Sequence, residues 1–228
     1  MPKSGGTFLS NKLAEYLGFS KEVIYEKSLR GWSENDILLH RFLDMKSRDV
    51  VLHTHVLGND GNCHHVFNHS DLVIFQTRRI RNVLESFRKH LLGESLFWSF
   101  ATIDNSFHQL SPSEQIDLLI DLVAPWMLNF YATWEKNLKN SALSGKIIHV
   151  SFDELIRDES KCLTGIITQI EGRCDSLKLG NVLNSRTCED RYKNNRSIED
   201  YTMSDFQFAR IANLAKHFRK TDFTPLGI

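Results

Sequence analysis

The chain of 228 residues is long enough to bury a full core, and this length favours one domain spanning residues 1–228. Its 28 basic and 28 acidic residues balance, which argues against a general nucleic-acid binder. No apolar run reaches the length of a membrane span. The four cysteines lack C-x-x-C spacing and are typical of reduced thiols, so we expect a cytoplasmic protein.

The first stretch combines a base, hydroxyls and two glycines, in the order Lys3, Ser4, Gly5, Gly6, Thr7 and Phe8. Glycines allow a tight turn and a close approach to a ligand. Thr7 is a candidate cap for a helix that Gly18 would end. A helix N-terminus with a nearby lysine is typical of a phosphate site, although an ordinary capped turn fits the same residues.

The middle of the chain alternates helices and strands. A helix is predicted over 33–46, followed by a buried strand over 49–55 with polar residues at its end. Residues 59–62 are predicted to form a loop. A second apolar strand over 71–77 leads into a helix that Gly93 ends.

The second half is predicted to be mainly helical. A capping box at 111–114 opens a long helix to about residue 140, which Pro125 should kink or split. A third strand is predicted at 146–150, then helices at about 152–158 and 160–171. Residues 172–201 look irregular and polar, and a last helix covers about 203–219.

This alternation predicts an α/β protein with a parallel sheet and right-handed crossovers. Ligands of such sheets bind beyond the C-terminal ends of the strands. Three polar clusters are expected to meet there, at residues 3–8, 53–55 and 77–81.

The opening loop, Pro2-Lys3-Ser4-Gly5-Gly6-Thr7-Phe8-Leu9, resembles the P-K-S-G-T-T-W-L loop of sulfotransferases that use 3′-phosphoadenosine 5′-phosphosulfate (PAPS). In that family the loop binds the 5′-phosphosulfate end of the cofactor, which implies contacts from the whole stretch 3–8. Gly6 stands for the first Thr of the pattern, and Phe8 stands for the Trp that lies against the adenine. The loop is not a Walker A motif, because Lys3 precedes the glycines.

Two further segments resemble parts of the family that hold the 3′-phosphate. Arg78 and Ser86 are eight residues apart, as in the R-N-P-K-D-V-x-x-S-Y segment, and the resemblance assigns them to that phosphate. A guanidinium offers phosphate a two-pronged hydrogen bond. Residues 191–197 stand where the family has a basic R-K-G loop, with Lys193 and Arg196 as the candidates, although the glycines are missing.

The strand end Leu52-His53-Thr54-His55-Val56 resembles the K-T-H-L segment of cytosolic sulfotransferases. The resemblance makes His55 the general base that acts on the acceptor, and histidine suits this task because its pKa lies near neutral pH. His53 takes the place of the family's lysine as an auxiliary group. The segment 149–158 also resembles the family, and we interpret it as structural.

The resemblance implies a P-loop-type three-layer fold with a central parallel sheet flanked by helices. The family's phosphate loop follows a buried strand, and only Met1 precedes Pro2 here. We therefore expect that the first strand is missing from the N-terminus and that the natural chain continues upstream.

The predicted function is transfer of a sulfuryl group from PAPS to a hydroxyl or amine of a small-molecule, glycan or peptide acceptor. Lys3 would stabilise charge beside the 5′-phosphate, and no metal is expected, because no carboxylate pair is evident and no second ligand pair follows Cys63-His64-His65. Two alternatives stay open: an ATP-dependent P-loop phosphotransferase, and a non-catalytic module that binds 3′-phosphoadenosine 5′-phosphate (PAP). Aromatic residues in the segment 93–110 either line an acceptor pocket or pack in the core; they are Phe97, Trp98, Phe100 and Phe107.

Overall fold

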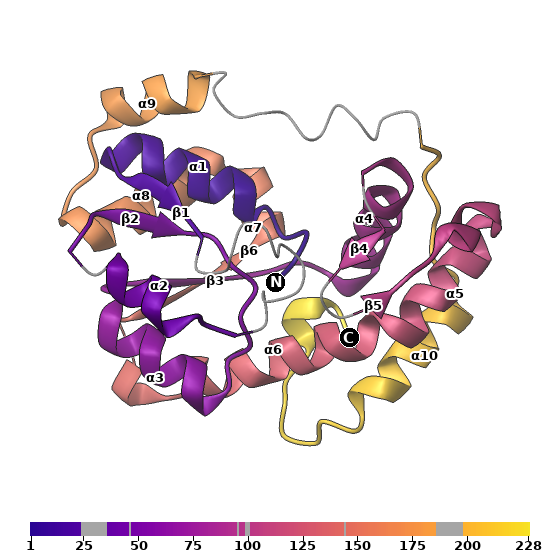
Figure 1. Cartoon of the computed structure of the whole chain (residues 1–228). Coiled ribbons are helices and arrows are strands. Elements are labelled where there is room, and N and C mark those ends of the chain that lie inside the picture. The colour runs from indigo at the N-terminus through magenta and orange to yellow at the C-terminus, as the bar shows by residue number, and fades with distance from the viewer. Residues whose placement is uncertain (24–35, 46, 95, 99–100, 144, 186–197) are drawn as a thin grey trace.

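The computed structural model describes residues 1–23, 36–45, 47–94, 96–98, 101–143, 145–185 and 198–228. Two small parallel sheets form its centre (Figure 1). β1 (Ser20–Glu22) pairs with β2 (Val50–Leu52), and β3 (Val73–Thr77) pairs with β6 (Ile147–Ser151). A short antiparallel pair, β4 (Phe97–Trp98) and β5 (Ala101–Thr102), stands apart from them.

Ten α-helices surround the strands in the described part of the chain. They are α1 (Gly6–Leu17), α2 (Leu39–Asp44), α3 (Asp60–His69), α4 (Ile80–Gly93), α5 (Pro112–Leu122), α6 (Ala124–Leu138), α7 (Phe152–Arg157), α8 (Glu159–Glu171), α9 (Ser176–Asn184) and α10 (Asp205–Ala215). In Figure 1, α1 and α9 lie above the strands, α2, α3 and α6 lie below them, and α4, α5 and α10 lie to the right.

The strands lie between two hydrophobic clusters, because successive side chains of a strand point to opposite faces. On β3, Phe75 belongs to the larger cluster with α4, α5, α6 and α10, whereas Ile74 packs on the smaller one with α1, α7, α8 and α9. The same alternation holds on β6, where Ile147 packs on the larger cluster and Ile148 on the smaller. The molecule is therefore an α/β protein, as predicted.

The expected single central sheet is not continuous. Within the described residues β2 and β3 do not pair with each other, and a cavity of about 170 Å³ lies between them. Only two-stranded sheets result, although each of the two is parallel, as the alternation of helices and strands predicted.

Several local predictions are confirmed by the helix ends. Ser111 and Glu114 form the expected capping box, with Pro112 at the first helical position of α5. Pro125 stands near the start of α6, and α5 and α6 meet at a bend of 44°. Gly18 ends α1 in the left-handed conformation, with φ 75°.

Other local predictions are wrong. Residues 59–62 are not a loop, because the side chain of Asn59 accepts a hydrogen bond from the amide of Asn62 and starts α3. The stretch 172–201 contains α9, which Asp175 caps. Of the helix predicted at 33–46, only 39–44 is helical among the residues described.

Among the described residues, no single helix has both the length and the apolar character needed to cross a membrane. Only α5 and α6 together, as the bent pair, reach that length and composition. Both helices contribute many of the fully buried side chains of the larger cluster.

Candidate functional site

The loop before α1 has a backbone that suits few residues. Lys3 has φ 59° and Gly5 has φ 83°, both in the left-handed region that favours glycine. A Cβ on Gly5 would also lie 3.1 Å from the ring of Phe152 and 3.2 Å from the side chain of Leu155. Left-handed backbone at a non-glycine residue costs on the order of 1–3 kcal/mol and clusters at functional sites.

Gly5, not the predicted Thr7, is the N-cap of α1, and no described side chain caps this helix. Thr7 lies inside the first turn, too late to satisfy the first amides. A helix start without a side-chain cap leaves its amides available to water or to a ligand.

Two side chains from the end of β3 fix the position of this loop. Gln76 Nε2 donates a hydrogen bond to the carbonyl of Ser4 at 3.1 Å, and Arg78 Nη1 donates to the carbonyl of Lys3 at 2.9 Å. The guanidinium of Arg78 also lies over the ring of Phe152, 4.2 Å from its centroid. The carbonyls of Lys3 and Ser4 thereby accept hydrogen bonds from side chains at the end of β3, which fixes the loop to this strand.

The two predicted histidines follow directly after β2. Their rings meet edge to face, with centroids 5.4 Å apart. His53 also reaches the loop, because a Cβ built on Gly6 would lie only 2.4 Å from His53 Nε2. The structure thus brings together residues of all three predicted polar clusters, at the C-terminal ends of β2 and β3.

The cavity between β2 and β3 borders this meeting point. Its lining includes Gly6, His53, His55, Gln76, Phe130 and Trp134. Trp134 Nε1 donates to the carbonyl of Val56 at 2.8 Å and so fixes the chain just beyond His55. Thr54 Oγ1 is buried and has no hydrogen-bond partner within the described part of the chain.

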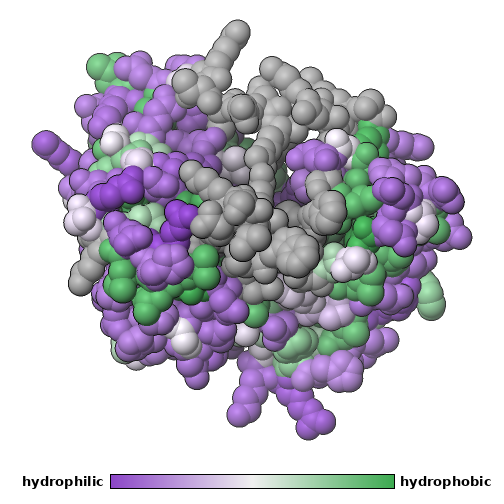
Figure 2. Space-filling model, in the orientation of Figure 1, coloured by the Kyte–Doolittle hydropathy of each residue, from purple (hydrophilic) through white to green (hydrophobic). Residues whose placement is uncertain are grey.

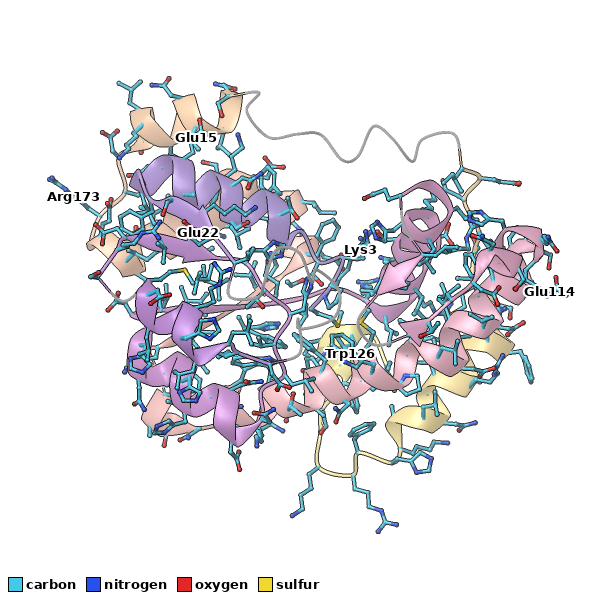
Figure 3. All side chains as sticks on the ribbon, in the orientation of Figure 1. Lys3, Glu15, Glu22, Glu114, Trp126 and Arg173 are labelled. Atoms are coloured by element: carbon cyan, nitrogen blue, oxygen red, sulfur yellow. The ribbon has the colours of Figure 1, made fainter. Side chains whose placement is uncertain are left out.

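In Figure 3, Lys3 lies near the centre, between the side of the molecule that carries α1 and the side that carries α4, whereas Glu15 and Glu114 lie toward the outside. On the face shown in Figure 2, hydrophilic residues make up most of the described surface, with smaller hydrophobic areas between them.

The remaining predicted residues lie farther along the chain or outside the description. Ser86 is half-buried on the second turn of α4, and Phe8 packs against the smaller hydrophobic cluster. Phe107 is 1% exposed and belongs to the larger cluster, so core packing holds for this member of the aromatic set. Lys193, Arg196 and Phe100 lie outside the described residues, as do the side chains of Phe97 and Trp98.

Sequence reasoning missed Gln76, although a polar residue inside the apolar run 73–77 was a usable signal. It also missed Lys12, which is 3% exposed. Lys12 Nζ donates to the carbonyls of Val182 at 2.5 Å and Ser185 at 3.0 Å, and so links α1 to the end of α9. A buried ammonium with several carbonyl partners is structural at this position.

The pairing of β3 with β6 places one more histidine near the site. His149 Nε2 is 2.8 Å from Thr77 Oγ1, and its ring packs on Phe75 with centroids 6.0 Å apart. His149 is an exposed residue of β6, but partial desolvation of its ring lowers the pKa of His149 below its usual value, because desolvation disfavours the charged form.

No group of three or more His, Cys, Asp or Glu side chains in the described ranges is placed to hold a metal ion. The three described cysteines, Cys63, Cys162 and Cys174, are free thiols. Cys63 and the histidines after it lie on α3, and burial raises the pKa of the Cys63 thiol.

Comparisons of the chain with protein-family models, with curated proteins and with solved structures find no significant match. The interpretation of the site therefore depends on its own geometry and on the sequence motifs.

Proposed function

We propose that this protein is a PAPS-dependent sulfotransferase with a P-loop-type α/β fold. The observation that carries the proposal is the arrangement of the glycine loop: Gln76 and Arg78 hold its carbonyls, and the histidine-bearing end of β2 lies against Gly6. The uncapped start of α1 fits an anionic ligand, since it offers amides and the positive end of the helix dipole.

In this proposal the bound donor supplies the sulfuryl group, and the chain supplies orientation and proton transfer. Lys3 and the first amides of α1 bind the 5′-phosphate end and stabilise the negative charge that develops there. His55 accepts the proton of the acceptor hydroxyl or amine at a ring nitrogen. Arg78 and Ser86 are the proposed 3′-phosphate ligands, with Lys193 and Arg196 as further candidates.

Two alternatives are distinguished by what they bind. An ATP-dependent phosphotransferase is disfavoured by the missing G-K-[ST] sequence, since that motif supplies the Ser or Thr hydroxyl that coordinates magnesium. A non-catalytic PAP-binding module is favoured by a specific observation: His53 and Gly6, two of the departures from the sulfotransferase pattern, lie in contact at the centre of the site.

The decisive measurement is a calorimetric titration with PAP, compared with ATP plus magnesium, followed by transfer of labelled sulfate from PAPS to a mixed acceptor set. We expect PAP binding without magnesium, and turnover of at least one acceptor. Tight PAP binding without turnover would favour the non-catalytic module. Binding of ATP only with magnesium would overturn the proposal.

The acceptor is proposed to be a small molecule, glycan or peptide rather than a nucleic acid, in keeping with the balanced charge of the chain. A cytoplasmic location is proposed from the free thiols Cys63, Cys162 and Cys174.

A further inference from the structure

Residue 6 has no space for a side chain because His53 occupies it. A Cβ at this position would lie 2.4 Å from His53 Nε2 and 2.9 Å from His53 Cδ2, closer than real Cβ contacts come. The side-chain oxygen of Gln76 would be 3.2 Å away. Any residue other than glycine here requires the imidazole to move.

The backbone itself does not require glycine at residue 6. Gly5 and Gly18 have positive φ, but Gly6 does not. Gly6 opens the first turn of α1, where glycine is a poorer helix former than alanine. The neighbouring ring, and not the local conformation, therefore selects glycine at this position.

We propose that Gly6 and His53 are a matched pair, in which the imidazole of His53 occupies the place of a side chain on residue 6. His53 then presents Nε2 beside the first turn of α1, next to the cavity. These two of the departures from the sulfotransferase pattern are thus linked: residue 6 has no side chain, and residue 53 supplies a ring in that space.

The pairing positions the imidazole of His53 beside the start of α1. There His53 donates to a bound oxyanion the hydrogen bond that a side chain on residue 6 would otherwise donate. The role as donor rests on the proposed function, because it needs a nucleotide at the start of α1. The pairing itself does not, because it follows from the contact between the ring and the glycine.

A double-mutant cycle, measured by Tm, tests the pairing in the full chain. Gly6→Ala should lower Tm in the parent protein, because the methyl group displaces the ring. In a His53→Ala background the same substitution should raise Tm by about 1–4 °C, because alanine is the better helix former. Gly165→Ala in α8 is the matched control, since among the described residues nothing beyond its chain neighbours and its own helix backbone lies within 4 Å of the added Cβ. We expect this control to raise Tm alike in both backgrounds. If Gly6→Ala shifts Tm equally in both backgrounds, the pairing is wrong.

A PAP titration tests the role as donor. His53→Ala should weaken binding about 10- to 100-fold, as expected for a lost hydrogen bond to a charged group. His53→Gln, whose amide nitrogen can stand near the place of Nε2, should restore affinity to within about threefold of the parent. Adding Gly6→Ala to His53→Ala should cause no further loss.

The outcomes separate this inference from the proposed function. If the parent binds PAP and His53→Ala binds it equally well, the role as donor is overturned. If the parent does not bind PAP, the proposed function fails and the role as donor fails with it, whereas the double-mutant cycle still decides the pairing.

Discussion

Two polar regions of this molecule differ in what their side chains bind. The first is centred on Arg88 of α4, which is 2% exposed. Its guanidinium donates twice to Glu85, at 2.9 Å each, and once to Gln115 at 3.0 Å, and it also bonds the carbonyl of Glu199. Glu85 in turn accepts from the amide of Tyr201 at 3.2 Å. This network joins α4, α5 and residues 199–201.

In the second region, at the ends of β2 and β3, side chains hold the loop before α1 in place. Gln76 and Arg78 bond the loop carbonyls, the start of α1 has no described side-chain cap, and a cavity adjoins His53 and His55. The network around Arg88 satisfies its own groups and stabilises the fold. The loop region uses Gln76 and Arg78 to hold backbone carbonyls beside a cavity, so the two regions should respond differently to mutation.

His55→Ala gives the largest expected effect. We predict that turnover of labelled sulfate falls by a factor of about 10²–10⁴, because a general base is lost. PAP affinity and the free energy of unfolding should change little, since His55 is only half-buried. Undiminished turnover by a folded variant would remove His55 from the mechanism.

Arg88→Met should produce the reverse of the His55→Ala result: the free energy of unfolding falls, whereas turnover by the folded protein changes little. Removing one partner of a buried ion pair leaves Glu85 uncompensated and typically costs about 3–5 kcal/mol. Urea unfolding measures this loss. Arg79→Ala is the control: its ion pair with Asp153 at 3.0 Å is on the surface, with Arg79 68% exposed, so it should cost at most about 1 kcal/mol. Similar losses for both variants would mean that the network around Arg88 adds little to stability.

Arg78→Ala tests both roles of one side chain. We predict a 10- to 100-fold loss of PAP affinity. Binding of adenosine 5′-phosphosulfate, which lacks the 3′-phosphate, should weaken less, because for this nucleotide the variant loses only the support that Arg78 gives to the loop through its contacts with Lys3 and Phe152. Gln76→Met, which removes only the bond to Ser4, should weaken both nucleotides equally. If Arg78→Ala also affects both equally, Arg78 holds the loop and does not bind the 3′-phosphate.

The smallest expected effect concerns His149 and pH. Because partial desolvation lowers its pKa in the folded state, the unfolded chain binds more protons once the pH falls below its unfolded pKa of about 6.5. The contribution of His149 to stability is therefore constant above that pH and becomes unfavourable below it. Unfolding between pH 7.5 and 5 should show a smaller loss of stability for His149→Gln than for the parent. A parallel decline in the two proteins would contradict this role.

The sequence predicted those features that depend on a few neighbouring residues. Ser111 and Glu114 signalled their capping box, and Pro125 the break between α5 and α6. Asn59 and Asp175 gave similar signals for α3 and α9, but the polar residues and glycines around them were interpreted as loop.

The internal geometry of the site was beyond the sequence. The bond from Gln76 to Ser4 and the contact of His53 with Gly6 join residues far apart in the chain, and only the packed strands bring them together. The pattern did predict that the three polar clusters would converge beyond the C-terminal ends of the strands, although β2 and β3 lie in separate sheets.

Trp134 gives the molecule an optical reporter of its own. The indole is 5% exposed, lines the cavity and donates its ring proton to the backbone of Val56. Its fluorescence emission depends on that hydrogen bond and on the polarity of the cavity. The emission of Trp134, one of the chain's four tryptophans, will shift in wavelength when a molecule enters the cavity or when the segment that carries His55 moves.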